Sequence, residues 1–127
     1  MRKVLTALLA LALSLLLVAP AVAQEDDSEV DYLALASLML RDGKLDRAIN
    51  ALDQVDLEAE DVNLVRYYTL RGMTHMRRKE LEPARDALDN AVSAGDAEPV
   101  VYVYLAQVNY QLEDYAGAVY ALSLIHI

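Results

Sequence analysis

Few residues of this chain have side chains suited to catalysis or metal binding. Histidine occurs only as His75 and His126, and cysteine does not occur at all. A catalytic triad or a histidine-based metal site would need His75 together with partners that the internal repeat of the chain places on other faces. The four glycines are scattered, so no phosphate-cradling loop is present. We therefore expect no catalytic residues, no metal site and no cofactor, and predict that the protein is not an enzyme.

Two short runs of carboxylates are the remaining candidates for binding a hard cation. They are Asp26-Asp27 and the segment that contains Glu58, Glu60 and Asp61. Neither run has the glycine-centred ligand spacing of a calcium-binding loop. We interpret both as solvated segments of the surface.

The only basic cluster consists of Arg71, Arg77, Arg78 and Lys79. A favourable interaction of cations with the C-terminal end of a helix explains most of this charge. Arg77, however, follows Arg41 by one repeat length, so the two side chains are expected to form a column. Two guanidinium groups can bind a partner's carboxylate through charge-assisted hydrogen bonds.

An internal repeat determines where all these residues lie. Tyr32, Tyr68 and Tyr102 follow one another at intervals of 36 and 34 residues. The same two intervals link four further columns: Ala36, Gly72 and Ala106; Leu45, Leu81 and Tyr115; Ala48, Ala84 and Ala118; and Leu52, Leu88 and Leu122. A shared register of this kind indicates a repeat architecture, with units at about 29–62, 65–98 and 99–127.

Each unit is predicted to form two helices. Apolar residues recur at spacings of three and four, and Asp42-Gly43 and Gly95 are helix stops, because glycine adopts the left-handed conformation that often follows a helix. The expected helices cover about residues 32–41, 45–55, 62–78, 81–94, 99–111 and 114 onward. The sequence therefore predicts an all-α fold.

These units resemble tetratricopeptide repeats (TPR), from residue 29 to about 122. The family's G-x-Y-x-x-A motif is matched by Gly43-Lys44-Leu45-Asp46-Arg47-Ala48 with Leu for the aromatic residue, and by Glu113-Asp114-Tyr115-Ala116-Gly117-Ala118 without the leading Gly. Small residues in the Ala36 and Ala48 columns allow two helices to cross closely. The resemblance implies an α-solenoid of about three antiparallel helix pairs.

In this family the first helices of successive units line a concave groove that binds an extended peptide or a helix. The resemblance therefore implies a partner-binding surface made of Leu33, Ser37, Leu40, Arg41, Thr69, Met73, Met76, Arg77, Val103, Gln107 and Tyr110. The Lys and Asn residues with which one family variant holds chaperone C-termini are absent from these positions. A role as a cytosolic co-chaperone is therefore not expected.

Residues 1–23 have the pattern of a secretory signal peptide. Arg2-Lys3 precedes an apolar stretch, and Pro20 and Ala21-Val22-Ala23 form a typical exit with cleavage after Ala23. The alternative is an uncleaved membrane anchor, which would be the only contact with a membrane. Cleavage predicts a periplasmic or secreted protein with a flexible acidic leader at 24–29.

The net charge of −9 becomes more negative once Arg2 and Lys3 are removed. Such a charge repels nucleic acid, so we expect a protein or peptide partner and no nucleic acid. The tail at 123–127 is apolar where an end cap should be polar, and it resembles translated sequencing-adapter sequence. We expect the chain to be the N-terminal part of a longer repeat protein, with self-association through its uncapped end as a further possibility.

Together these features predict a protein-interaction scaffold or adaptor of the bacterial cell envelope. The alternative is the repeat region of a larger envelope enzyme or transport complex, whose active part lies outside this chain.

Overall fold

The computed structural model of the protein describes residues 29–125. These residues form helices and contain no strand, which confirms the expected all-α fold for this part of the chain. The predicted signal peptide, residues 24–28 of the acidic leader, and the last two residues of the tail, including His126, lie outside the described residues.

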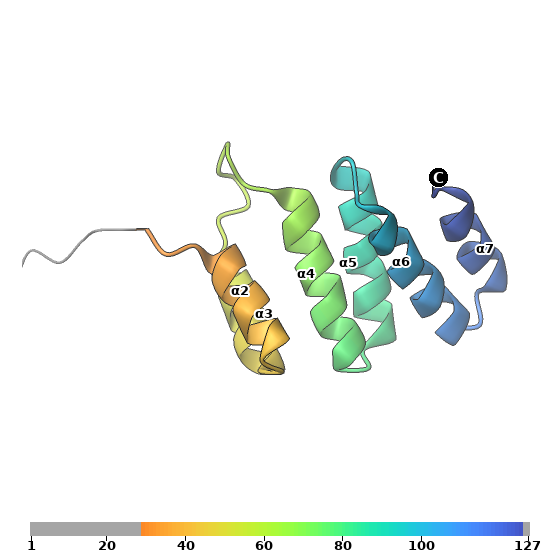
Figure 1. Ribbon diagram of the computed structural model, residues 1–127, viewed down its shortest axis with the longest axis horizontal. Coiled ribbons are helices and arrows are strands. Elements are labelled where there is room, and N and C mark those ends of the chain that lie inside the picture. The colour runs from red at the N-terminus through yellow and green to blue at the C-terminus, as the bar shows by residue number, and fades with distance from the viewer. Residues whose placement is uncertain (1–28, 126–127) are drawn as a thin grey trace, which may run out of the picture. The chain divides into compact units, whose positions relative to one another are not determined.

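Six helices follow one another within residues 29–125 (Figure 1). They are α2 (Tyr32–Arg41), α3 (Leu45–Asp53), α4 (Leu64–Arg77), α5 (Leu81–Ala94), α6 (Pro99–Gln111) and α7 (Tyr115–Ser123). Their ends lie within two residues of those expected from the sequence. None of these helices has both the length and the apolar character needed to cross a membrane.

The helices associate as three hairpins, each joined by a short turn. The closest packing is within the pairs α2–α3, α4–α5 and α6–α7. Neighbouring hairpins also touch, since α4 contacts both α2 and α3, and α6 contacts both α4 and α5. Helices α4 and α6 therefore each pack on their own partner and on the hairpin before them.

The turns inside the three hairpins have the same backbone geometry. Gly43, Lys79 and Glu113 each adopt a positive φ, of 75°, 61° and 62°. In each turn the amide of the next residue donates a hydrogen bond to the carbonyl five residues earlier: Lys44 to Met39, Glu80 to His75, and Asp114 to Asn109. This bond is the mark of a Schellman C-cap. The three residues with positive φ are separated by 36 and 34 residues, the same intervals that link the five columns found in the sequence.

The helix starts are fixed by local capping residues. Asp31 and Asn63 each accept a hydrogen bond of 3.0 Å from the amide three residues on, at the starts of α2 and α4. Asp114 does the same for α7 at 2.9 Å. Pro99 is in the first turn of α6, where its missing N–H is not needed. Gly95 follows the last residue of α5 as expected, but the left-handed conformation expected for it is wrong, because its φ is 162° and its backbone is extended.

Two hydrophobic clusters form the core of the helical part. One joins α2, α3 and the first half of α4, and the other joins α5, α6 and α7, while Tyr68 contacts both. The expected close helix crossing is present in the second hairpin: a Cβ on Gly72 would lie 2.7 Å from Cγ of Leu88 and 3.5 Å from the carbonyl of Ala84. No side chain fits between α4 and α5 at this point.

Candidate functional site on the first helices

The predicted groove residues lie on α2, α4 and α6, and their exposure rises along the chain. On α2 and α4, the side chains of Leu33, Ser37, Thr69, Met73 and Met76 are half-buried. On α6, Val103, Gln107 and Tyr110 are exposed, Val103 by 44% and Tyr110 by 65%. The difference arises because α4 covers part of α2 and α6 covers part of α4, whereas no described first helix follows α6.

Leu40 does not belong to this surface. It is only 3% exposed and lies in the first core cluster with Ala36 and Leu52. Its place in the core follows from the packing of α4 against the C-terminal end of α2, where Nη1 of Arg77 donates a hydrogen bond of 2.6 Å to the Leu40 carbonyl. The prediction of Leu40 as a partner-binding side chain is therefore corrected.

The two arginines of the expected column have different surroundings. The side chain of Arg41 is 77% exposed, and its Nε lies 4.0 Å from a carboxylate oxygen of Asp42, which is a long contact for an ion pair. Arg77 uses one nitrogen to cap the carbonyl of Leu40. The guanidinium of Arg41 is therefore accessible to a ligand, whereas that of Arg77 already binds the backbone of α2.

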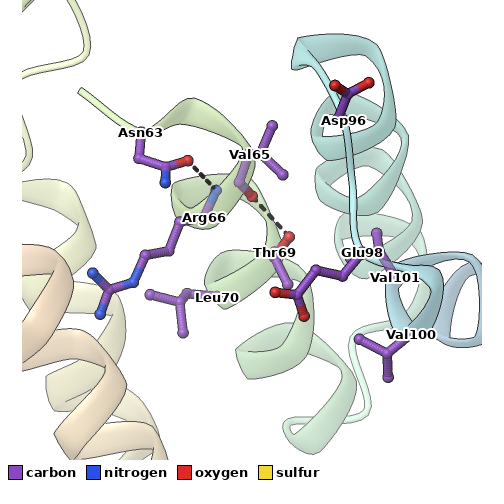
Figure 2. A pocket seen from close by; sticks show the side chains of 9 residues that line it. All are labelled: Asn63, Val65, Arg66, Thr69, Leu70, Asp96, Glu98, Val100 and Val101. Atoms are coloured by element: carbon purple, nitrogen blue, oxygen red, sulfur yellow. Dashed lines mark hydrogen bonds between the residues drawn. The ribbon is translucent and has the colours of Figure 1, made fainter. Parts of the chain in front are cut away.

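A cavity of about 400 Å³ lies between the N-terminal parts of α4 and α6 (Figure 2). Nine residues line it: Asn63, Val65, Arg66, Thr69, Leu70, Asp96, Glu98, Val100 and Val101. Buried Leu70 and Val101 supply apolar walls. Of the predicted groove residues only Thr69 takes part, so the structure places the hollow of this surface nearer the helix N-termini than the sequence suggested.

Polar groups surround the cavity on one side. The Thr69 hydroxyl donates a hydrogen bond of 2.7 Å to the Val65 carbonyl, which fixes its hydrogen and leaves the oxygen as an acceptor. Figure 2 shows the guanidinium of Arg66 pointing away from Asp96 and Glu98. The same figure shows the Glu98 carboxylate turned toward Thr69, whereas the Asp96 carboxylate points away from the other lining side chains. Glu98 therefore gives the α6 side of the cavity a negative charge, and an apolar side chain beside a cationic group would suit it.

Sequence reasoning missed Asp96, Glu98 and Val100 as site residues. The signal was available, because these residues surround Pro99 at the start of a predicted first helix. Helix α6 contacts α4, and the residues that line the cavity come from the N-terminal parts of both helices.

Comparison with models of known families, curated proteins and solved structures found no match to this chain.

The basic cluster on α4 holds neighbouring helices together. Arg71 donates to Asp53 of α3 at 3.0 Å, and Arg78 reaches Asp46 of α3 at 2.7 Å. The pKa of Arg71 is raised, because its bonds to Asp53 and Tyr67 outweigh the opposing effect of burial. These contacts lie on the side of α4 that faces α3.

His75 belongs to the same network and has a carboxylate partner. Its Nδ1 lies 3.2 Å from Oε1 of Glu80, which also accepts from Nε of Arg78 at 2.5 Å. The hydrogen bond from His75, and then the charge and hydrogen bond of Arg78, lower the pKa of the Glu80 carboxyl. The arrangement joins the end of α4 to the start of α5. Within residues 29–125, no three metal-ligating side chains cluster as a metal site would require.

Proposed function

We propose that this protein is an exported scaffold of the cell envelope, a TPR-like α-solenoid that binds a partner protein along α2, α4 and α6. The repeated turn geometry at Gly43, Lys79 and Glu113 supports the solenoid, as does the close crossing at Gly72. Export rests on the signal-peptide pattern of residues 1–23.

The cavity between α4 and α6 is the observation that carries the proposal. It combines apolar walls with the carboxylates of Asp96 and Glu98, on the surface that also presents Met73 and Val103. Methionine adapts its shape to different apolar partners, so Met73 suits a surface that receives a peptide. The partner has an apolar side chain next to a lysine or arginine, which enters the cavity.

The charges at the two ends of the first helices differ in sign. Asp96 and Glu98 lie at the N-terminal end, and Arg41 ends α2. The 14 residues of α4 span roughly 20 Å at about 1.5 Å per residue. An extended segment needs more than about six residues at about 3.3 Å per residue, because Arg41 lies on α2 and the cavity lies between α4 and α6. Its basic residue lies at the cavity and its acidic group near Arg41.

A photo-crosslinking experiment tests this proposal in cells. A photoreactive amino acid replaces exposed Gln107 on α6 in the full chain, and the matched control carries it at exposed Asn90 on α5. We expect a discrete crosslinked partner from position 107 and none from position 90. Equal crosslinking from both positions, or none from position 107, contradicts a groove on the first helices.

A charge variant tests the chemistry of the partner. Glu98→Lys should weaken the crosslink at position 107 at least about tenfold, because a like charge would then face the partner's cation. Glu82→Lys is the matched control, since Glu82 is an exposed carboxylate in the first turn of α5. An unchanged crosslink in the Glu98 variant would show that the partner is not recognised through a basic residue.

A further inference from the structure

The exposed apolar side chains of the described residues gather on two parts of the helical array. Most lie on the last hairpin, on α6 and α7: Val100, Val103, Tyr110, Tyr115, Val119, Tyr120 and Leu122. A smaller group, Leu35 and Leu38, lies on α2. Tyr110 of α6 and Tyr115 of α7 are in contact, with ring centroids 5.4 Å apart, and exposed apolar side chains that gather in this way often mark a contact with another protein.

The Leu52 column shows that the face on α7 has the composition of an internal interface. Leu52 is 1% exposed and Leu88 is fully buried, whereas Leu122, in the same register, is 49% exposed. The first two leucines lie on helices that are followed by another hairpin, α4 after α3 and α6 after α5. Leu122 therefore has the side chain of a covered position but no described helix on top of it.

The internal interface also shows what kind of helix fits such a face. Leu88 on α5 is in one core cluster with Val101, Leu105 and Val108 of α6, which are all at most 5% exposed. These three α6 residues have the spacing of one helix stripe, at i, i+4 and i+7. A helix that covers Leu122 in the same way needs apolar residues at the positions of Leu105 and Val108.

Helix α2 has leucines at those positions. Leu35 and Leu38 precede Leu105 and Val108 by two repeat intervals, and they are 36% and 40% exposed. The corresponding α6 residues are buried because the α4–α5 hairpin precedes them. Leu35 and Leu38 on α2 therefore form the kind of apolar stripe that packs against a face such as the one around Leu122.

The two helices that carry these surfaces have few charges, although the chain as a whole has a net charge of −9. Helix α7 contains no charged residue, and α2 contains only Arg41, at its end. By contrast, α5 carries several acidic residues along its length. The charged position of this register is Asp31, the N-cap of α2, which precedes Val101 by two repeat intervals and lies at the end of the leucine stripe.

We propose that copies of this chain bind head to tail, with α2 of one copy packed on the α6–α7 face of another. The contact reproduces the packing of α6 on the α4–α5 hairpin. It is heterologous, since two different surfaces meet, and it leaves a free surface at each end for further copies. Tyr110 occupies the register of half-buried Met76, so a following α2 would cover it and extend the first-helix surface into the next copy.

The test uses residues 24–127, which contain both hydrophobic clusters. Leu38→Glu removes the α2 surface, Leu122→Glu removes the α7 surface, and Leu57→Glu is the matched control, because Leu57 is 41% exposed in the loop before α4. Analytical ultracentrifugation gives the mass of each protein across a concentration series. Circular dichroism checks that each variant keeps its helices, and Leu35→Glu and Val119→Glu form a second pair if one variant unfolds.

We expect the mass of the wild type and of Leu57→Glu to rise with concentration, and both surface variants to weaken association at least about 100-fold through the burial of a carboxylate. The deciding measurement mixes the two surface variants. Each retains one intact surface, so together they should form a dimer and nothing larger.

Three results would overturn this proposal. A wild type that is monomeric at all concentrations removes it, and so does a Leu38→Glu variant that associates like the wild type, which would indicate a symmetric contact between α7 helices. Failure of the mixed variants to form a dimer contradicts two complementary surfaces. The inference is independent of the proposed partner groove, whose test is crosslinking at position 107.

Discussion

At the scale of single residues, Asn109 is a polar side chain buried among apolar neighbours. It is 6% exposed, and within residues 29–125 its Oδ1 is the buried side-chain atom found without a hydrogen-bond partner. Met39 and His75 occupy the same register in the other hairpins, and His75 has its partner in Glu80. A buried polar atom without a partner reduces stability, because it loses its bonds to water.

Replacing Asn109 by leucine should therefore stabilise the protein. We expect Asn109→Leu to raise the free energy of unfolding by about 1 kcal/mol, the cost of a buried unpaired polar group less some misfit in packing. Urea unfolding followed by circular dichroism measures the change. Asn90→Leu, at an exposed site on α5, should leave the midpoint nearly unaltered. A lower midpoint for Asn109→Leu would mean that the amide has a partner in solution.

Glu80 makes stability depend on pH in a predictable direction. Its pKa in the folded protein lies below the ordinary value of 4.5, because His75 and Arg78 hydrogen-bond its charged form. The carboxylate thus contributes stability above the unfolded pKa, and that contribution is lost as the pH falls through the folded pKa. Glu80→Gln should show a weaker loss of stability on acidification below pH 4.5 than the wild type. Thermal unfolding midpoints measured across that pH range test this, and Glu58→Gln, at an exposed site, is the control. If the midpoints of Glu80→Gln and the wild type fall in parallel as the pH is lowered, this account is wrong.

At the scale of the helices, the repeated turn explains how three different residues can end a first helix. Gly43 adopts its positive φ without strain, whereas Lys79 and Glu113 carry a Cβ in the left-handed region. The hydrogen bonds of the turn are the same in all three hairpins, so tertiary packing and capping maintain a conformation that two of the residues disfavour.

Lys79→Gly should therefore stabilise the α4–α5 hairpin by about 1 kcal/mol, because glycine has no left-handed penalty. Gly43→Ala is the matched reverse change and should cost a similar amount, since no atom lies within 4 Å of the added methyl group to compensate or clash. Both are read from chemical denaturation midpoints. If the two variants shift the midpoint in the same direction, backbone strain is not the cause.

The crossing of α4 and α5 depends on the absence of a side chain at Gly72. An added Cβ would lie 2.7 Å from Cγ and 2.8 Å from Cδ2 of Leu88, which is fully buried. We expect Gly72→Ala to lower the free energy of unfolding by about 1–2 kcal/mol, because overpacking outweighs the higher helix propensity of alanine. Gly95→Ala places its methyl at an ordinary 3.4 Å from Val65 and should be close to neutral. Equal stability of the Gly72 variant and the wild type would show that the helices can separate at little cost.

At the scale of the whole helical part, contacts are distributed unevenly among the six helices of residues 29–125. Helix α4 packs on α2, α3, α5 and α6, whereas the main contact of α7 is with α6. In arrays of this kind each hairpin is stabilised chiefly by its neighbours. The middle hairpin has a neighbour on both sides, and the last described hairpin has one.

Hydrogen exchange should therefore be slowest in α4 and α5 and fastest in α7 when the protein is dilute. Mass spectrometry of residues 24–127 at several exchange times measures this order. Raising the protein concentration should slow exchange in α7 and α2 more than in α5, if copies bind head to tail. Uniform exchange in all helices at low concentration would show that the array unfolds as one cooperative unit.

The six helices, their hairpin pairing and their common register follow from the amino-acid sequence alone. These features depend on residues close together in the chain: the helical spacing of apolar residues, the caps at Asp31 and Asn63, and the glycine turn at Gly43. The close crossing at Gly72 was also predictable, because a column of small residues is typical of two helices whose backbones approach closely.

The accessibility of the predicted surface residues and the position of the cavity depend instead on tertiary packing. Leu40 is buried, and Arg77 is bonded to a carbonyl 37 residues away in the sequence. The cavity is lined by Thr69, on α4, together with Asp96 and Glu98, which lie in the connection before α6. The angle and distance between hairpins arise from the packing of whole side chains across each interface, and a repeat interval does not contain that information.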